Sequence, residues 1–193
     1  FLSYTYSLNQ YETDKNAALR INHLPLNRVE GCDITTIINE AQKVRDLGAE
    51  YIVLFIHTGN AYQPFPGPQT QELFKNIATQ TEVDFIAGGH PHNIQPLQKF
   101  TLPNKTVFAC YSLSDFIAYD IYQRCHLSLF LTLNLARQNG GVSLVSITVN
   151  SNYMEYKSGK LTLRNFDEMM KRPINDKKIA DLQQLYHQTI LVE

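Results

Sequence analysis

Short apolar runs alternate in the first half of the chain with a segment whose apolar positions recur every three or four residues. The runs over 51–56 and 83–87 are rich in aliphatic side chains, which is typical of buried strands. Between them, residues 69–79 carry their apolar positions on one helical face. A strand, a helix and a second strand form a parallel crossover unit, so the pattern predicts an α/β arrangement.

The same patterns predict elements on both sides of this unit. Residues 1–6 alternate aromatic and small side chains and predict a strand, and the polar stretch 7–31 predicts an irregular loop. A helix with one apolar face is predicted over 34–47, with Asp33 as its cap and Gly48 ending it. Hairpins are predicted from strands over 95–102 and 105–112 and from strands over 127–135 and 142–149, followed by a strand near 160–163 and a helix over 175–189.

Composition excludes several classes of function. A chain of 193 residues with 44% hydrophobic content can bury the core of about one domain. Its formal net charge is −1 and its basic residues are scattered, so we expect no nucleic-acid partner. No apolar stretch reaches the length that spans a bilayer. Cys32, Cys110 and Cys125 lack C-x-x-C spacing, so we expect buried free thiols rather than disulfides or a thiolate zinc site.

Three histidines follow the two strands of the crossover unit. His57 comes directly after the first strand, and His90 and His92 come after the second strand and its Gly88-Gly89 pair. Because the carboxyl ends of parallel strands meet at one edge of a sheet, we expect the three rings to lie close together. Neutral imidazole is a strong ligand for Zn, Mn and Fe ions. The sequence therefore indicates a divalent-metal site at this edge.

The residues around His90 and His92 suit such a site. Pro91 favours extended backbone at His90, and residues two apart in an extended segment point the same way. Gly88 and Gly89 permit a sharp turn and a close backbone approach. Without His57 upstream, the two histidines would be interpreted equally well as part of an ordinary surface loop.

Three blocks of the chain add a family resemblance. They are HTGNAY over 57–62, GHPHNIQP over 89–96 and YSLSDFI over 111–117, with Pro66 and Gln69 between the first two. Their order and spacing resemble the patterns H-W-G-x-E-Y, G-H-H-P-H-x-x-Q-P and Y-S-L-G-N-F of CapA-like capsule synthesis proteins. That family belongs to the calcineurin-like metallophosphoesterase superfamily, and the resemblance covers roughly residues 1–135.

The resemblance implies a fold and a set of site residues. The fold is α/β, part of a four-layer α-β-β-α metallophosphoesterase-like sandwich with mixed sheets. Two divalent ions (Mn, Zn or Fe) are implied, with His57 and His90 sharing one ion and His92 serving the other. Asp115 either holds a ligating histidine by a hydrogen bond or is an ordinary turn aspartate. The residues implied near the substrate or behind the ligands are Asn60, Tyr62, Gln69, Gln95, Tyr111 and Asp115.

The chain also departs from the family pattern. Thr58 stands at the family's tryptophan, Ala61 at its glutamate, Gly89 at the first histidine of the second block, and Ser114-Asp115 at its Gly-Asn pair. The loss of a carboxylate at Ala61 removes a group that orients ligands or takes part in acid–base work. No catalytic residue is therefore assigned from the sequence.

The family's remaining ligands belong to the first half of its fold. Upstream of His57 there is one Asn-His pair, Asn22-His23, and it lacks the flanking glycine and acid, so we interpret it as polar loop. The sequence thus predicts that residues 1–149 are the carboxyl-terminal half of a CapA-like domain and that 150–193 are a strand and helix extension. The amino-terminal half of the same protein is then the expected partner, and we expect this chain alone to bind metal weakly.

Several functions remain open at this point. The resemblance implies a metal-dependent hydrolase acting on a phosphoester or on an envelope polymer such as poly-γ-glutamate. It also implies a location at the cell surface, anchored in the membrane through a segment upstream. The alternatives are a non-catalytic polymer-binding module with a degenerate metal site, a structural half-domain, and a closed structural zinc site built from His57, His90 and His92.

Overall fold

The crossover unit forms as the apolar pattern predicts. In the computed structural model, β2 (Val53–His57) and β3 (Phe85–Gly89) run parallel, and α2 (Pro68–Gln80) connects them. The register places His57 opposite Gly89. The structure describes residues 1–8, 21–28, 31–117, 120–138, 140–171, 173–174 and 176–190, so most of the predicted loop over 7–31 lies outside the described residues.

The crossover unit lies within a five-stranded mixed sheet. The strand order is β1-β2-β3-β5-β4, and the pairs β1/β2, β2/β3 and β3/β5 are parallel. The predicted hairpin at Pro103-Asn104 is confirmed, because β4 pairs antiparallel with β5 and Leu102 donates to the Lys105 carbonyl. The added elements are β1 (Leu2–Thr5), α1 (Thr35–Asp46), β4 (Leu97–Thr101) and β5 (Thr106–Cys110).

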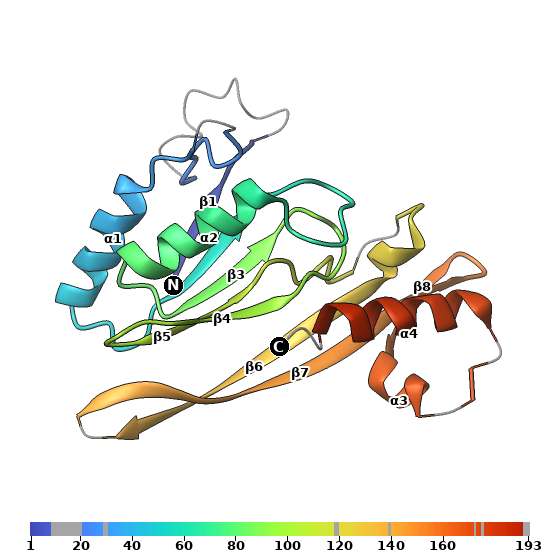
Figure 1. The fold of residues 1–193 in the computed structure, drawn as a ribbon. Coiled ribbons are helices and arrows are strands. Elements are labelled where there is room, and N and C mark those ends of the chain that lie inside the picture. The colour runs from blue at the N-terminus through green and yellow to red at the C-terminus, as the bar shows by residue number, and fades with distance from the viewer. Residues whose placement is uncertain are drawn as a thin grey trace.

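Two helices cover one face of this sheet and leave part of the other open. Figure 1 shows α1 and α2 on the same side of the strands. Leu54 and Ile56 point toward these helices and are at most 2% exposed, whereas Phe55 points the other way and is 43% exposed. Alternate residues of a strand face opposite sides, so β2 presents a buried face and an open face.

A second sheet, antiparallel and three-stranded, follows. Its order is β6 (Leu127–Gln138), β7 (Gly141–Lys157) and β8 (Lys160–Asn165). The hairpin is longer than predicted, and the expected boundary at residue 149 falls inside β7. The helices α3 (Phe166–Met170) and α4 (Lys177–Ile190) pack near one end of this sheet (Figure 1), and α3 was not predicted.

Two apolar clusters hold these parts together. The first joins α1 and α2 to the inner positions of the five-stranded sheet, including Leu54, Phe74 and Ile86. The second joins Cys110 and Ile94 to residues of β6, α3 and α4. The prediction of an α/β fold with mixed sheets is confirmed by this topology. Cys32, Cys110 and Cys125 are free thiols, and Cys110 and Cys125 are buried.

Candidate functional site

The three predicted histidines lie at the carboxyl ends of β2 and β3. The ring centroids of His57 and His90 are 4.9 Å apart, and those of His90 and His92 are 6.0 Å apart. The Nδ1 atom of His90 lies 3.1 Å from Nε2 of His57, so these two rings share a hydrogen bond. The sheet therefore brings the three imidazoles to one edge.

The backbone that carries His90 and His92 is a strained turn. Their φ angles are +109° and +58°. The prediction that Pro91 imposes extended backbone at His90 is therefore wrong. Two hydrogen bonds hold the turn: Tyr62 N–H donates to the Pro91 carbonyl at 2.8 Å, and the Ser114 hydroxyl donates to the His92 carbonyl at 3.0 Å. Such conformations cost about 1–3 kcal/mol each and persist only where the surroundings fix them.

Strain extends to the residues that hold this turn. Tyr62 and Ser114 also have positive φ angles, +64° and +67°. The described non-glycine residues with positive φ are therefore these four and Ser158, which lies in the turn between β7 and β8. Strained backbone concentrates at functional sites in proteins, so the clustering supports a functional role for this edge.

Gly88 brings another strand close to the site. A Cβ atom added at Gly88 would lie 2.1 Å from the backbone oxygen of Tyr111, which no side chain tolerates. Leu113 N–H donates to the Gly88 carbonyl at 3.1 Å, which ties the segment after β5 to the end of β3. The close backbone approach expected at Gly88 is thus present, and it positions the block that carries Asp115.

Asp115 backs His92. Its two carboxylate oxygens lie 3.0 and 3.1 Å from Nδ1 of His92, which therefore donates to the carboxylate. This contact fixes the ring and leaves Nε2 as the atom available for a ligand. The ring of Tyr62 stacks on His92 at 5.4 Å with an interplanar angle of 19°. His92 is consequently oriented from two sides.

The rings of His57 and His90 are kept neutral near neutral pH. Burial, and then the nearby His57 and His92, lower the pKa of His90 to about 4. Burial first and then His92 lower the pKa of His57, against a smaller opposing effect of Asp115. Neutral imidazole is the form that binds metal ions. The electrostatics of the cluster therefore favour ligand chemistry over a positively charged site.

The other residues implied by the family pattern lie outside this cluster. Tyr111 packs its ring on Phe74 and donates to Gln98, and Gln69 lies on the first turn of α2. Gln95 is 1% exposed and donates from Nε2 to the Gln63 carbonyl at 2.8 Å. Asn60 is an exposed loop residue after β2. Gln95 thus supports the loop that carries Tyr62 rather than reaching the histidines.

Sequence reasoning missed three residues that shape the site. The Tyr6 hydroxyl lies 3.0 Å from Nε2 of His90, and its ring stacks on His57 at 6.2 Å. Asn27 accepts hydrogen bonds from the Thr58 hydroxyl and the Gly59 N–H and so fixes the turn after His57. Tyr122 packs against Tyr62 at 4.8 Å.

Tyr6 had a signal in the sequence, because it follows the strand adjacent to β2 at the same edge as His57. No feature of the sequence indicated that Asn27 or Tyr122 lies at the site. Asn22-His23 lies outside the histidine cluster: Asn22 donates to the Ser3 carbonyl, and Nε2 of His23 lies 2.9 Å from the Tyr6 carbonyl.

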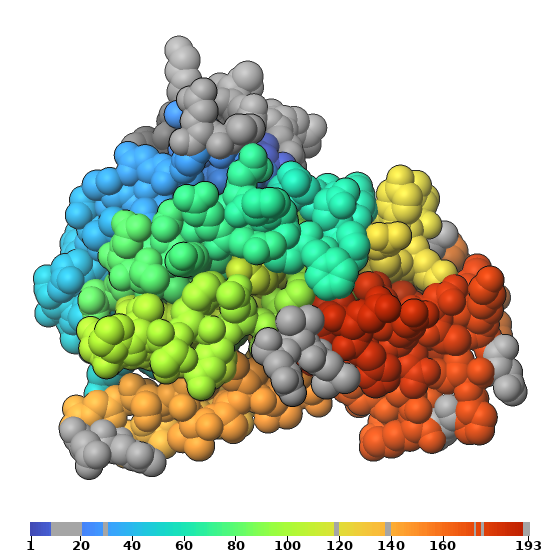
Figure 2. Space-filling model, viewed as in Figure 1, coloured from blue at the N-terminus to red at the C-terminus, as the bar shows by residue number. Residues whose placement is uncertain are grey.

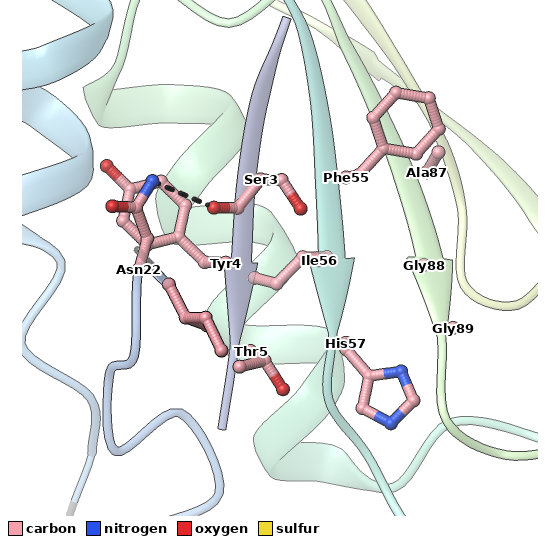
Figure 3. A pocket seen from close by; sticks show the side chains of 11 residues that line it. Ser3, Tyr4, Thr5, Asn22, Phe55, Ile56, His57, Ala87, Gly88 and Gly89 are labelled. Carbon is pink, nitrogen blue, oxygen red and sulfur yellow. Dashed lines mark hydrogen bonds between the residues drawn. The ribbon is translucent and has the colours of Figure 1, made fainter. Parts of the chain in front are cut away.

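An open cleft adjoins His57. It has a volume of about 460 Å³ and lies on the face of β1–β3 that the helices leave uncovered. Figure 3 shows its floor, where the Phe55 ring lies beside Ala87 and the His57 ring stands at the end of β2. Ser3 and Asn22 form its polar side, joined by a hydrogen bond of 3.1 Å.

The donor set fits a divalent ion in its chemistry but not in number. The pKa values of His57 and His90 are lowered, and His92 is oriented by a carboxylate, as in metal sites of proteins. Over the described ranges, however, no group of three or more His, Cys, Asp or Glu side chains is arranged to hold an ion. Catalytic zinc sites normally use three protein ligands. The three described rings alone would therefore not complete such a site.

Comparisons with known proteins identify a matching family and a similar solved structure. The sequence model of a family described as bacterial capsule synthesis protein PGA_cap matches residues 1–120. Among solved structures, the calcineurin-like phosphoesterase YfkN from Bacillus subtilis is similar at 16% sequence identity and a TM-score of 0.38. That match covers 80% of this chain and 42% of YfkN, so the chain spans less than half of that protein's length. The comparison with curated proteins finds no match.

Proposed function

This chain belongs to the bacterial capsule synthesis protein family PGA_cap, and we propose that it supplies part of a divalent-metal site for hydrolysis or transfer during capsule synthesis. The observation that supports the proposal is the convergence of His57, His90 and His92 at one sheet edge, with Asp115 behind His92. The three rings are neutral or hydrogen-bonded to an acceptor, as metal ligands require.

Each residue has a distinct role in this proposal. His57 and His90 offer neutral nitrogens to one ion, His92 offers Nε2 to a second, and Asp115 holds His92 in the ligating tautomer. Tyr62 fixes the ring plane of His92, and the Tyr6 hydroxyl holds His90. A bound divalent ion (Mn, Zn or Fe) supplies a polarising charge and a water of lowered pKa.

The proposed substrate class is a phosphoester or an envelope polymer such as poly-γ-glutamate. Membership of a capsule synthesis family supports action at the bacterial envelope. We propose that the protein acts at the cell surface and is anchored there by a segment outside these 193 residues. Among the described residues, no helix is both long and apolar enough to cross a membrane.

The missing ligands are proposed to come from the amino-terminal half of the same protein. Three histidines give two ions at most two protein ligands each, fewer than catalytic sites use. The open face of β1–β3 supports this partner, because Phe55 is 43% exposed on it and the cleft beside His57 lies there. A second layer of protein on this face would bury Phe55 and bring its own ligands next to His57.

Metal titration tests the proposal. We expect Mn²⁺ or Zn²⁺ to bind the 193-residue chain weakly in isothermal titration, at one site or fewer per chain. The variant His92→Ala should weaken binding at least tenfold, whereas His187→Ala, on an exposed part of α4, should leave it unchanged. Equal binding by both variants would refute the histidine site, and two tight sites in this chain would refute the need for further ligands.

A non-catalytic polymer-binding module is the second candidate. It is favoured by Ala61 at the position of a family carboxylate and by Ser114-Asp115 at its Gly-Asn pair. In that case the protein including its amino-terminal half would bind a γ-linked glutamate oligomer without cleaving it, with or without metal. Product analysis after prolonged incubation separates this function from hydrolysis.

A further inference from the structure

A groove lies between the β4 edge of the five-stranded sheet and β7, and Gln71 of α2 is among the residues that line it. It has a volume of about 680 Å³, within the range of sites that hold small molecules. Figure 2 shows the yellow-green atoms of the β4–β5 region lying over the orange atoms of β7. The groove is lined mainly by apolar side chains, among them Phe65, Leu97, Phe108, Ile147 and Val149.

These apolar residues are not fully buried against one another. Leu97, Phe108, Ile147 and Val149 are each partly exposed, although they lie on the facing sides of the two sheets. Facing side chains of packed sheets normally interdigitate and exclude solvent. Here, in contrast, the facing apolar side chains remain partly exposed to solvent along the groove.

The groove has one cationic side chain and no described carboxylate among its lining residues. Lys99 projects from β4 and lies 6.0 Å from the centre of the Phe108 ring. No ion pair joins Lys99 to any acidic side chain that the structure describes, whereas Arg45, Arg137, Arg164 and Lys171 each have such a partner. The uncompensated charge is therefore placed beside an apolar surface.

We propose that this groove binds an amphipathic anion, with its apolar chain along Leu97, Phe108 and Val149 and its charged head at Lys99. The alkyl chain would cover the apolar surface, and the ammonium group would gain an anionic partner that no described side chain provides. This inference does not depend on the histidine site, and none of its residues belongs to that site.

The groove nevertheless borders the loop that supports the histidines. Phe65 lines the groove, and two residues earlier in the same loop the Gln63 carbonyl accepts hydrogen bonds from Asn93 and Gln95. Tyr62, the next residue toward the amino terminus, stacks on His92. A ligand that reached Phe65 would therefore touch the loop that orients His92.

Alkyl phosphates below their micelle concentration are the probe. We expect dodecyl phosphate to bind by isothermal titration and affinity to fall about fourfold per methylene removed in the decyl and octyl compounds. Lys99→Gln should weaken binding about threefold, whereas Lys160→Gln, an exposed lysine on β8, should not change it. The uncharged dodecyl maltoside should bind more weakly than dodecyl phosphate.

Methyl NMR locates the ligand. Resonances of Ile147 and Val149 should shift with the titration, and that of Ile77, which is fully buried on the inner face of α2, should not. Equal weakening by Lys99→Gln and Lys160→Gln, or shifts spread to Ile77, would show nonspecific association and overturn the proposal. Binding to anionic phospholipid vesicles is the remaining control. If an Ile147→Glu variant with a native NMR spectrum bound these vesicles as well as the unmodified chain does, the effect of Lys99 would belong to a membrane surface, and the groove proposal would be overturned.

Discussion

Single residues at the sheet edge are held by contacts that leave little freedom. His90 touches both His57 and Tyr6, and His92 is held between Asp115 and Tyr62. Each histidine therefore has two oriented neighbours in addition to its strained backbone. A site with this many fixed contacts loses little entropy when a ligand binds.

Replacement of Gly88 tests the closest of the backbone approaches. Gly88→Ala should lower the free energy of unfolding by about 3 kcal/mol or more, because the new Cβ would overlap the Tyr111 carbonyl. Gly141→Ala is the matched control, since nothing lies within 4 Å of that position, and it should be neutral or slightly stabilising. Urea denaturation gives both values, and equal effects would contradict the close approach.

The pKa of His90 predicts a pH dependence of stability. Its folded value is about 4 and its usual value is 6.5, so the unfolded chain binds a proton between these limits that the folded chain does not. The free energy of unfolding should therefore fall as pH falls from 6.5 to 4, and show no contribution from His90 above that window. Urea denaturation in EDTA should give a shallower pH slope for His90→Gln than for the unmodified chain.

His187→Gln, on the exposed side of α4, serves as the control for this slope. An unchanged slope in His90→Gln would mean that the ring is not kept neutral by its surroundings.

At the scale of elements, a polar clamp joins α1 to the starts of β2 and β3. Arg45 donates to the carbonyls of Ala49 and Glu82, each at 2.8 Å, and to Asp84 at 2.6 Å. The same Asp84 oxygen accepts the Ile52 N–H at 2.7 Å. This network fixes the end of the crossover unit opposite to the histidines.

Removal of the clamp should be costly. Arg45→Ala should lower the free energy of unfolding by about 2–3 kcal/mol, because partly buried, charge-assisted hydrogen bonds are lost together. Arg164→Ala breaks the exposed pair with Glu155 and should cost less than about 1 kcal/mol. Thermal or urea unfolding of both variants tests this prediction. If Arg45→Ala and Arg164→Ala lowered the free energy of unfolding equally, the Arg45 network would stabilise the protein no more than an exposed ion pair does.

At the scale of the whole molecule, the two faces of the five-stranded sheet differ. The helix side carries the first apolar cluster, whereas β1–β3 are open on the other side, where the cleft beside His57 lies. β6 and β7 extend along the rest of the sheet, and the ion pair of Arg137 with Glu50 joins β6 to the segment before β2. Within the described residues, the edge that carries the histidines thus borders an open face of the sheet.

This openness leads to a prediction on activity. We expect the 193-residue chain alone to show no appreciable turnover of a chromogenic phosphodiester or a γ-linked glutamate oligomer with added manganese or zinc. The physical reason is the ligand count, since three histidines cannot hold two ions in catalytic geometry. Under the function proposed above, a longer chain that supplies the further ligands would be the active form. Robust metal-dependent turnover by the chain alone, abolished in His92→Ala, would show that the site is complete within it.

The sequence determined the features that depend on neighbouring residues. Apolar periodicity predicted the crossover unit, the hairpin at Pro103-Asn104 and the position of His57 at a strand end, because strand and helix patterns are local and repeat along the chain. It also predicted that Gly88 permits a close approach. Element ends were less accurate: β7 continues past residue 149, because the polar run Asn150-Ser151-Asn152 interrupts the apolar alternation.

Only the tertiary structure decided which side chains meet at the site. Tyr6 joins His90 across 84 residues, and Asn27 fixes the turn after His57 across 31, and no local pattern encodes contacts at such separations. The positive φ of His90 likewise results from hydrogen bonds made by distant segments, which overcome the local preference imposed by Pro91. Periodicity fixes the faces of elements, but packing between elements fixes which atoms come within bonding distance.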